Sequence, residues 1–469
     1  MTVDLVVRHP RSREPERRYV YEQVMVDWLG LTLHCCAEDR DDVLLESSGS
    51  VGGPHVRLSD SFLALPSNLW LTPDSLPRSG PVTLEGARSF ATRSLDEEVL
   101  LPWPSTGMTP AVRRLEDGSL HIGADLFGAA FFFLTRYEEV AAPAVDRFGR
   151  YPAASSWTVQ HGLIERPLVD EYLAVLRAAL LILWPKLPIT EPESRVYVSH
   201  DVDLPLRYRW SSFARTLGGG LRDWRLGGGV AGVMHRMRDW HAVRHRGRYD
   251  RDPYNTFEDL ISCAQRWCQP SAFFFLADRT CHTYDGLYDI NDFFIVDLLR
   301  RLAESGQEIG LHPSFETWLD AQQTSREKQR LLAACERAGF RPSALGGRQH
   351  YLRWKAPSTW LNWESAGMAY DSTLCFAERA GFRAGTAREY RAFDLVGSRR
   401  LRLMERPLIV MDTTLLDYMQ LGPTEQAIQR GLCLKKRCQR LGGNFTILWH
   451  NSNLTTQAHW HVFLELAEP

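Results

Sequence analysis

Short apolar runs alternate with longer segments that carry apolar residues at helical spacing from about residue 195 to the end of the chain. Strands that alternate with helices in this way indicate a parallel sheet, either open or closed into a barrel. The pattern predicts helices at 256–267, 292–304, 326–338, 357–366 and 425–441. It predicts strands at 195–203, 271–276, 308–311, 345–347, 401–404, 409–411 and 445–449, and a strand or turn at 368–372.

The first part of the chain has a different pattern. Segments 24–35, 44–47 and 56–66 are short and β-leaning or mixed, whereas 125–139 and 167–184 read as helices. Asp125 is the candidate N-cap of the first of these helices. A chain of 469 residues is too long for one ordinary domain. We therefore expect a smaller mixed α+β domain over 1–190 and an α/β domain over 191–469.

An insertion at about 206–252 interrupts the second domain. It is rich in arginine, with interleaved tryptophans and two triple glycines, Gly218–Gly220 and Gly227–Gly229. Because glycine disfavours a continuous helix, we expect a helix, a flexible hinge and a second helix. The insertion is either a solvated, partly mobile segment or a lid. Such a lid would grip an anionic substrate, such as a diphosphate carrier or sugar nucleotide, or contact an anionic membrane surface.

Composition narrows the class of protein. With 44% hydrophobic and 24% charged residues the chain is typical of soluble globular proteins, and a net charge of −2 argues against a nucleic-acid binder. The N-terminal residues lack the apolar core of a signal peptide, and no apolar run is long enough to span a membrane. Nine cysteines without Cys-x-x-Cys spacing suit a reducing compartment. We expect a cytoplasmic protein with at most peripheral membrane contact.

Polar residues follow four of the predicted strands. Two carboxylates spaced i and i+2 on extended backbone point the same way and repel unless a cation lies between them. Alone, such a pair fits an acidic turn equally well. The carboxyl ends of parallel strands meet at one face, however, so the four strand ends together indicate a site. The strand-end residues are Asp201, Asp203, His312, Arg348-Gln-His-Tyr351 and His450.

These motifs, Asp201-Val-Asp203, Glu308-Ile-Gly-Leu-His312, Arg348-Gln-His-Tyr351 and Leu448-Trp-His450, occur in an order that resembles the polysaccharide deacetylase superfamily. This is the NodB-homology superfamily, carbohydrate esterase family four. Residues 195–469 most resemble its branch associated with O-antigen and surface-polysaccharide biosynthesis. The resemblance implies a distorted (β/α) barrel of about seven strands and metal-assisted removal of an acetyl group. The first domain resembles the one found ahead of such deacetylases, for which no chemistry is implied.

The resemblance also implies catalytic roles. Asp201 would be the general base, and Arg348 would hold and orient it. The backbone N–H of Tyr351 would help to bind the oxyanion, and His450 would be the general acid. Asp412 follows a late strand and either orients His450 or caps that strand.

The implied metal ligands are Asp203 and His312. Many members of the superfamily have a second histidine four residues after the first, but this chain has Glu316 there. His350 stands where the third motif usually has proline, and we favour it as the third ligand over Glu316 or a water. One carboxylate with imidazoles suits a divalent metal, most of all zinc, with cobalt or nickel as substitutes.

Three further residues are candidates for substrate binding. His200 lies beside the predicted base, Arg353 follows the third motif, and Asp371 belongs to a Tyr-Asp-Ser-Thr segment. The function expected is a metal-dependent deacetylase acting on an N-acetylated sugar, linked to a nucleotide or lipid, in surface-polysaccharide biosynthesis. The alternatives are a non-catalytic carbohydrate-binding or scaffold protein on the same barrel, and a hydrolase of another non-peptide C–N bond.

Overall fold

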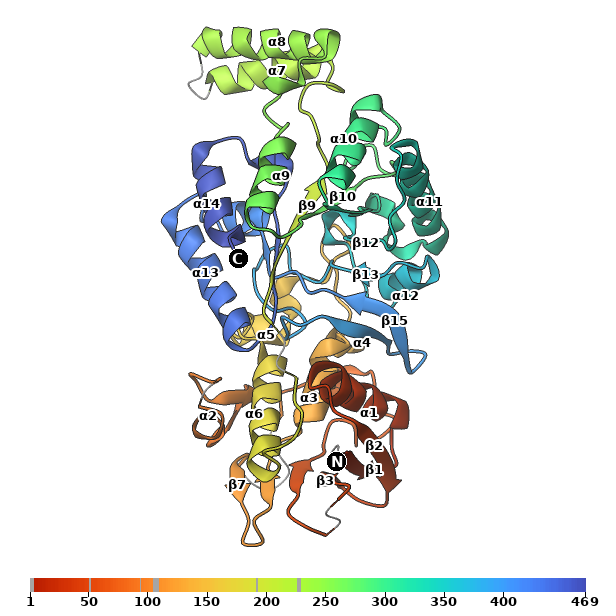
Figure 1. Ribbon diagram of the computed structural model, residues 1–469, viewed down its shortest axis with the longest axis vertical. Coiled ribbons are helices and arrows are strands. Elements are labelled where there is room, and N and C mark those ends of the chain that lie inside the picture. The colour runs from red at the N-terminus through yellow and green to blue at the C-terminus, as the bar shows by residue number, and fades with distance from the viewer. Residues whose placement is uncertain (1–3, 50–51, 93, 104–108, 191–192, 226–228) are drawn as a thin grey trace. The chain divides into compact units, whose positions relative to one another are not determined.

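The computed structural model describes residues 4–49, 52–92, 94–103, 109–190, 193–225 and 229–469 (Figure 1). The chain forms two compact units. The first comprises 1–195, 352–409 and 433–446, and the second comprises 196–351, 410–432 and 447–469. The sequence places a boundary near 190, close to the observed change at 195. The return of later segments to the first unit is not visible in the sequence, because periodicity does not show which elements pack together.

The first unit contains a six-stranded mixed sheet in the order β2-β1-β3-β4-β8-β7. The strand β1 pairs in parallel with β2 and antiparallel with β3. A separate antiparallel pair is formed by β5 and β6. The bounds are β1 Leu5–Pro10, β2 Leu33–Glu38, β3 Asp42–Ser47, β4 Val56–Ser59, β5 Val82–Leu84, β6 Val99–Leu101, β7 Val112–Arg114 and β8 Leu120–Ile122.

Helices of the first unit are α1 Glu14–Tyr21, α2 Ala87–Phe90, α3 Leu126–Leu134, α4 Tyr137–Ala141, α5 Trp157–Gln160, α6 Leu168–Leu183 and α12 Ser358–Ser365, with a π-helix at Glu22–Trp28. The predicted helix 167–184 corresponds to α6. The predicted helix 125–139 is broken, because Arg136 has a left-handed φ of 54°. The side chain of Asp125 accepts a hydrogen bond from the backbone of Gly128, which confirms the predicted N-cap. The segment 24–35 is helical as far as Trp28.

Three later strands also belong to the first unit: β13 Tyr370–Asp371, β14 Tyr390–Asp394 and β15 Arg399–Glu405. The strand β15 pairs antiparallel with β14 and in parallel with β13. Sequence periodicity does not predict β14, which contains the charged residues Arg391 and Asp394.

The second unit is organised around parallel strands. The strands β12, β11, β10 and β9 lie side by side in that order, and β9 is followed by β17 and β16. All the pairings β9–β10, β10–β11, β11–β12 and β16–β17 are parallel. The chain is therefore a mixed α/β protein, and closure into a barrel of about seven strands stays a prediction. The bounds are β9 Val196–Val202, β10 Ala272–Phe275, β11 Glu308–Leu311, β12 Gly346–Gly347, β16 Val410–Met411 and β17 Phe445–Leu448.

The remaining helices are α7 Phe213–Asp223, α8 Gly229–Arg246, α9 Phe257–Arg266, α10 Phe293–Glu304, α11 Ala321–Arg337, α13 Glu425–Arg440 and α14 Gln457–Ala467. Short 3₁₀ or π turns occur at Pro73–Ser75, Ala153–Ser155, Tyr249–Arg251, Phe315–Leu319, His350–Leu352, Thr414–Tyr418 and Asn451–Asn453. No helix in the described ranges has both the length and the apolar character needed to cross a bilayer.

The arginine-rich insertion forms the helix pair α7 and α8, which lie side by side in Figure 1. The break expected at Gly218–Gly220 is wrong, because these glycines lie inside α7. A Cβ on Gly220 would lie 3.2 Å from Val233 and 3.4 Å from Arg236, so the lack of side chains lets the two helices approach closely. Gly227 and Gly228 lie outside the described residues, and Gly229 begins α8.

Candidate metal centre

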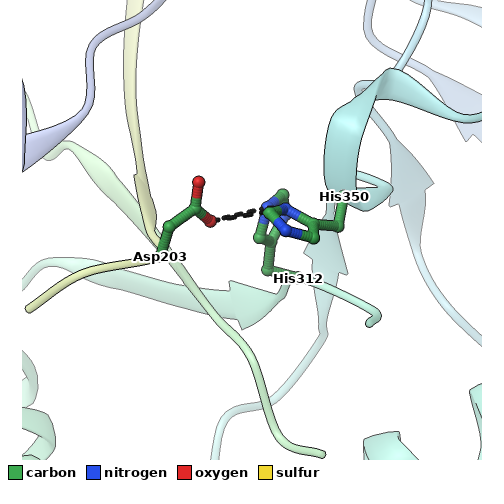
Figure 2. Close-up of side chains that lie close together, drawn as sticks. All are labelled: Asp203, His312 and His350. Atoms are coloured by element: carbon green, nitrogen blue, oxygen red, sulfur yellow. Dashed lines mark hydrogen bonds and ion pairs between the residues drawn. The ribbon is translucent and has the colours of Figure 1, made fainter. Parts of the chain in front are cut away.

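Three ligand-type side chains that follow three strands of the same sheet converge in the second unit (Figure 2). Asp203 follows β9, His312 follows β11 and His350 follows β12. Oδ1 of Asp203 lies 3.1 Å from Nε2 of His312 and 3.5 Å from Nδ1 of His350. These two nitrogens are 2.9 Å apart. Three potential ligand atoms thus form one compact triangle.

Backbone carbonyls determine the tautomers of both histidines. Nδ1 of His312 lies 2.6 Å from the carbonyl oxygen of Arg348, and Nε2 of His350 lies 3.0 Å from that of Tyr284. A carbonyl only accepts hydrogen bonds, so each of these nitrogens carries hydrogen. If both rings are neutral, Nε2 of His312 and Nδ1 of His350 carry no hydrogen, and their lone pairs point toward each other and toward Asp203. Such an arrangement is repulsive unless a cation lies among the three atoms.

The donor set fits a divalent metal. Ligand atoms about 2.0–2.1 Å from a tetrahedral zinc ion lie roughly 3.3 Å from one another, and the triangle has edges of 2.9, 3.1 and 3.5 Å. Oδ1 of Asp203 is buried and accepts no hydrogen bond from the residues described. A carbonyl behind each imidazole is the usual support of a metal-binding histidine.

The electrostatics of the three residues agree with a cation site. Burial acts to raise the pKa of Asp203, but the imidazoles of His350, His312 and His450 outweigh it and hold the pKa well below its usual range. Burial lowers the pKa of His350. It also acts to lower the pKa of His312, but the carboxylates of Asp201 and Asp203 raise it overall. A cation among the three side chains would therefore be stabilised by the carboxylate of Asp203, and its binding would be linked to the protonation of the imidazoles.

Asp201 is fixed next to this triangle by Arg348. Nη1 of Arg348 donates to Oδ1 of Asp201 at 2.7 Å, and Nη2 donates to Oγ of Ser199 at 2.9 Å. The second carboxylate oxygen of Asp201 lies 3.8 Å from Nε2 of His312. Asp201 and Arg348 are both buried. One oxygen of this carboxylate is thus held by arginine, and the other borders the ligand atoms.

His450 forms a dyad with Asp412. Nδ1 of His450 lies 2.8 Å from Oδ1 of Asp412, and the backbone N–H of His450 donates to Oδ2 at 2.8 Å. Nε2 of His450 lies 3.5 Å from Oδ2 of Asp203. Burial acts to lower the pKa of His450, but Asp412 and then Asp203 raise it to about 10. The ring is therefore an oriented imidazolium at neutral pH. Of the two roles left open for Asp412, the structure favours orienting His450.

Tyr351 follows His350 directly and has a left-handed φ of 61°. Its ring packs against those of His350 and Tyr284, with centroids 4.9 and 5.2 Å apart. Glu316, the other candidate third ligand, is exposed on the turn Phe315–Leu319 and is not part of the triangle. The oxyanion role of the Tyr351 N–H stays a prediction.

None of the three predicted substrate-binding residues is a member of the triangle. His200 is fully buried and packs on Phe273 and Phe463, because alternate side chains of β9 point to opposite faces. Arg353 and Asp371 belong to the first unit. Nε of Arg353 donates to the carbonyl of Phe148, and Asp371 accepts from the backbone of Thr373. Their roles in binding substrate stay predictions.

Sequence reasoning missed the loop that holds Tyr284, Asp285 and Gly286. Asp285 accepts backbone hydrogen bonds from Thr280 and Phe315, both at 2.8 Å, which fixes the loop. A Cβ on Gly286 would clash with the carbonyl of Asp203. The Asp-Gly pair signals a turn, but no local signal shows that this turn supports His350 and Asp203.

Comparisons with known proteins give distant matches. Residues 5–185 match the model of a family of unknown function, DUF7033. No curated protein matches the chain. A Mycobacterium smegmatis protein assigned as a polysaccharide deacetylase has a TM-score of 0.36 and 18% identity, covering 59% of this chain and 83% of that one. The polysaccharide deacetylase Bc1974 from Bacillus cereus has a TM-score of 0.28 and 12% identity, and the match covers 58% of this chain and 86% of that one. PuuE allantoinase has a TM-score of 0.35 and 13% identity, and the match covers 61% of this chain and 85% of the allantoinase chain. Matches this distant do not assign an activity to the chain.

Proposed function

We propose that this protein is a metal-dependent hydrolase that removes the acetyl group from an N-acetylated sugar. One observation carries the proposal. Backbone carbonyls fix His312 and His350 so that their lone pairs face the carboxylate of Asp203. Asp201, bound by Arg348, lies beside these side chains. His450, bound by Asp412, lies beside them as well.

The residues divide the work of amide hydrolysis. A divalent ion held by Asp203, His312 and His350 would polarise the acyl carbonyl and acidify a water. Asp201 accepts the proton of the attacking water, and Arg348 holds this carboxylate in its orientation. His450, charged through its contact with Asp412, donates a proton to the leaving nitrogen. The N–H of Tyr351 contributes a donor for the oxyanion.

The proposal also includes the sugar substrate, the biosynthetic process that it belongs to and the compartment in which the enzyme acts. They are supported by the resemblance of the strand-end motifs at 201–203, 308–312, 348–351 and 448–450 to deacetylases of surface-polysaccharide biosynthesis. All nine cysteines are free, which suits the reducing cytoplasm. We propose a cytoplasmic reaction on a biosynthetic intermediate.

Metal content tests the ligand set. The purified protein is expected to contain about one divalent ion per chain, and His350→Ala to lose it. His461→Ala is the control, since His461 is exposed on α14. Elemental analysis after gel filtration measures the ratio of metal to protein. Full metal content in His350→Ala would overturn the assigned ligand set.

Acetate release tests the catalytic roles. N-acetylated sugars should yield acetate in a reaction that chelator abolishes and zinc restores. Asp201→Asn and His450→Gln should retain metal but lower kcat by roughly 10²–10⁴-fold, as expected for acid–base groups. A metal-loaded protein that releases no acetate, but opens a cyclic imide or removes a formyl group, would be a hydrolase of another C–N bond. Absence of any turnover would favour a carbohydrate-binding protein.

A further inference from the structure

A cavity of about 270 Å³ adjoins the metal centre within the second unit. Asp203 lines one part of it, and the arginine-rich insertion lines another, with Arg207, Arg215 and Arg236 among the lining residues. Pockets that enclose whole drug-sized ligands measure about 300–1,000 Å³, so this cavity suits one charged portion of a larger substrate.

Arg207 is held by aromatic rings. Its guanidinium carbon lies 5.8 Å from the ring centroid of Tyr208 and 5.6 Å from that of Tyr254. The backbone N–H groups of Arg207 and Tyr208 both donate to Asp252, at 2.8 and 2.9 Å. Ring contacts of this kind leave the N–H edges of a guanidinium available for hydrogen bonds. Arg207 is therefore pre-positioned without its donors being used by the rings.

Acidic side chains near the cavity are engaged by other partners. Asp292 pairs with Arg209 at 2.9 Å, and Asp239 pairs with His235 at 3.0 Å. Among the residues that the structure describes, no carboxylate forms an ion pair with Arg207 or Arg215. Arg207 and Arg215 thus bring positive charge to the wall of a cavity that Asp203 also lines.

Gly219 shapes the wall formed by α7. A Cβ at this position would lie 2.5 Å from Nη1 of Arg236. The guanidinium from α8 therefore occupies the space that a side chain on α7 would otherwise fill, and both residues line the cavity. This gives the triple glycine a role in shaping the cavity.

From these features we infer that the cavity binds the phosphate or diphosphate group of an activated sugar whose acetyl group lies at the metal centre. Arginine guanidinium groups bind phosphate oxygens through paired hydrogen bonds, and Arg207 and Arg215 place two such groups at the wall. The substrate is then a carrier-linked sugar rather than a free sugar or a finished polymer. The inference rests on the proposed function for the reaction, but the anion site itself does not depend on turnover.

Calorimetric titration with uridine diphosphate tests the anion site in the metal-loaded protein. The variant Arg207→Gln/Arg215→Gln should weaken binding by roughly tenfold or more, because hydrogen bonds to charged groups are lost. The control is Arg222→Gln/Arg238→Gln, which makes the same change in net charge at exposed positions of α7 and α8 outside the cavity. The control should bind like the wild type. Equal weakening in both variants, undiminished binding in the first, or no binding by the wild type would overturn the inference.

A second titration, with a ten-carbon prenyl diphosphate, distinguishes the carriers. Tighter binding of uridine diphosphate identifies a nucleotide carrier, and tighter binding of the prenyl compound identifies a lipid carrier. A neutral N-acetylglucosamine glycoside should bind more weakly than either. If it binds as tightly and is insensitive to the arginine changes, the cavity does not recognise phosphate.

Kinetics separates failure of the inference from failure of the proposed function. With uridine-diphosphate-linked or prenyl-diphosphate-linked N-acetylglucosamine, Arg207→Gln/Arg215→Gln should raise KM with little effect on kcat. If the double variant releases acetate with unchanged KM and kcat, the phosphate site is overturned and the proposed hydrolase is not. Diphosphate binding by a chain that takes up no metal and releases no acetate overturns the hydrolase alone.

Discussion

At the scale of single residues, the centre depends on which nitrogen of each histidine carries hydrogen. The carbonyls of Arg348 and Tyr284 settle this for His312 and His350. The side chains of the same two residues also lie at the site: Arg348 binds Asp201, and Tyr284 packs against Tyr351. The candidate metal site is therefore positioned by the main chain of adjacent loops as much as by its three side chains.

The Asp412–His450 pair predicts a change in pH dependence. The ordinary pKa of histidine is about 6.5, and Asp412 raises that of His450 to about 10 against the effect of burial. The acid is active when protonated, so activity is lost as pH rises through this pKa. Asp412→Asn removes the main raising influence, and the alkaline limb of kcat/KM should move to lower pH. Asp417→Asn, an exposed residue shortly after Asp412, should leave the profile unchanged.

The Arg348–Asp201 pair predicts a large effect on stability. Both side chains are buried, with 0% and 3% of their surface exposed. Arg348→Met leaves Asp201 as an unpaired buried charge, which costs about 3–5 kcal/mol. Urea unfolding measures the loss, and adding Asp201→Asn should recover part of it. The exposed Arg300 pairs with Asp297 and Glu304, and Arg300→Met should change stability little.

At the scale of elements, glycines decide how closely strands and helices approach. A Cβ on Gly347 in β12 would clash with the carbonyl of Leu311 in β11. A Cβ on Gly310 in β11 would likewise lie only 2.5 Å from the carbonyl oxygen of Gly346. These glycines let the strands that position His312 and His350 lie side by side. Packing thus explains Gly310 in the second motif and Gly347, which directly precedes the third motif.

The same substitution at two glycines should have opposite effects. Gly347→Ala is expected to destabilise the fold by about 1–3 kcal/mol through overpacking against backbone, measured by urea unfolding. Gly218, inside α7, has no atom within 4 Å of its Cβ position. Gly218→Ala should stabilise α7 by about 0.5–1 kcal/mol, because alanine loses less backbone entropy. Slower amide exchange in α7 would show this, and faster exchange would contradict it.

Element boundaries were predictable where local signals are strong. The strand 308–311 agrees with β11, and 425–441 agrees with α13 to within one residue. The break between α3 and α4 was not predictable. Arg136 and Glu139 look like the solvated end of a helix, but both are buried in an ion pair of 2.9 Å. Only the fold supplies the partners that make burying these charges possible.

At the scale of the whole molecule, metal binding should contribute to stability. An ion at a thousand times its dissociation constant stabilises the folded state by about 4 kcal/mol. Chelator should therefore lower the melting temperature of the wild type, and zinc should restore it. His350→Ala should show no such shift, whereas His461→Ala should behave like the wild type. An unchanged melting temperature in the chelated wild type would contradict a structural contribution of the ion.

The sequence by itself determined most of the strands and helices between 195 and 449 and the polar residues at the strand ends, because periodicity and turn signals are local. It did not determine β14 or α14. It pointed to Asp203, His312 and His350 as candidate ligands, but left Glu316 open. Tertiary structure decided between them, since His350 reaches the triangle and Glu316 is exposed. It also decided the tautomers, the Asp412–His450 dyad and the discontinuous units, because each depends on groups far apart in sequence that only folding brings together.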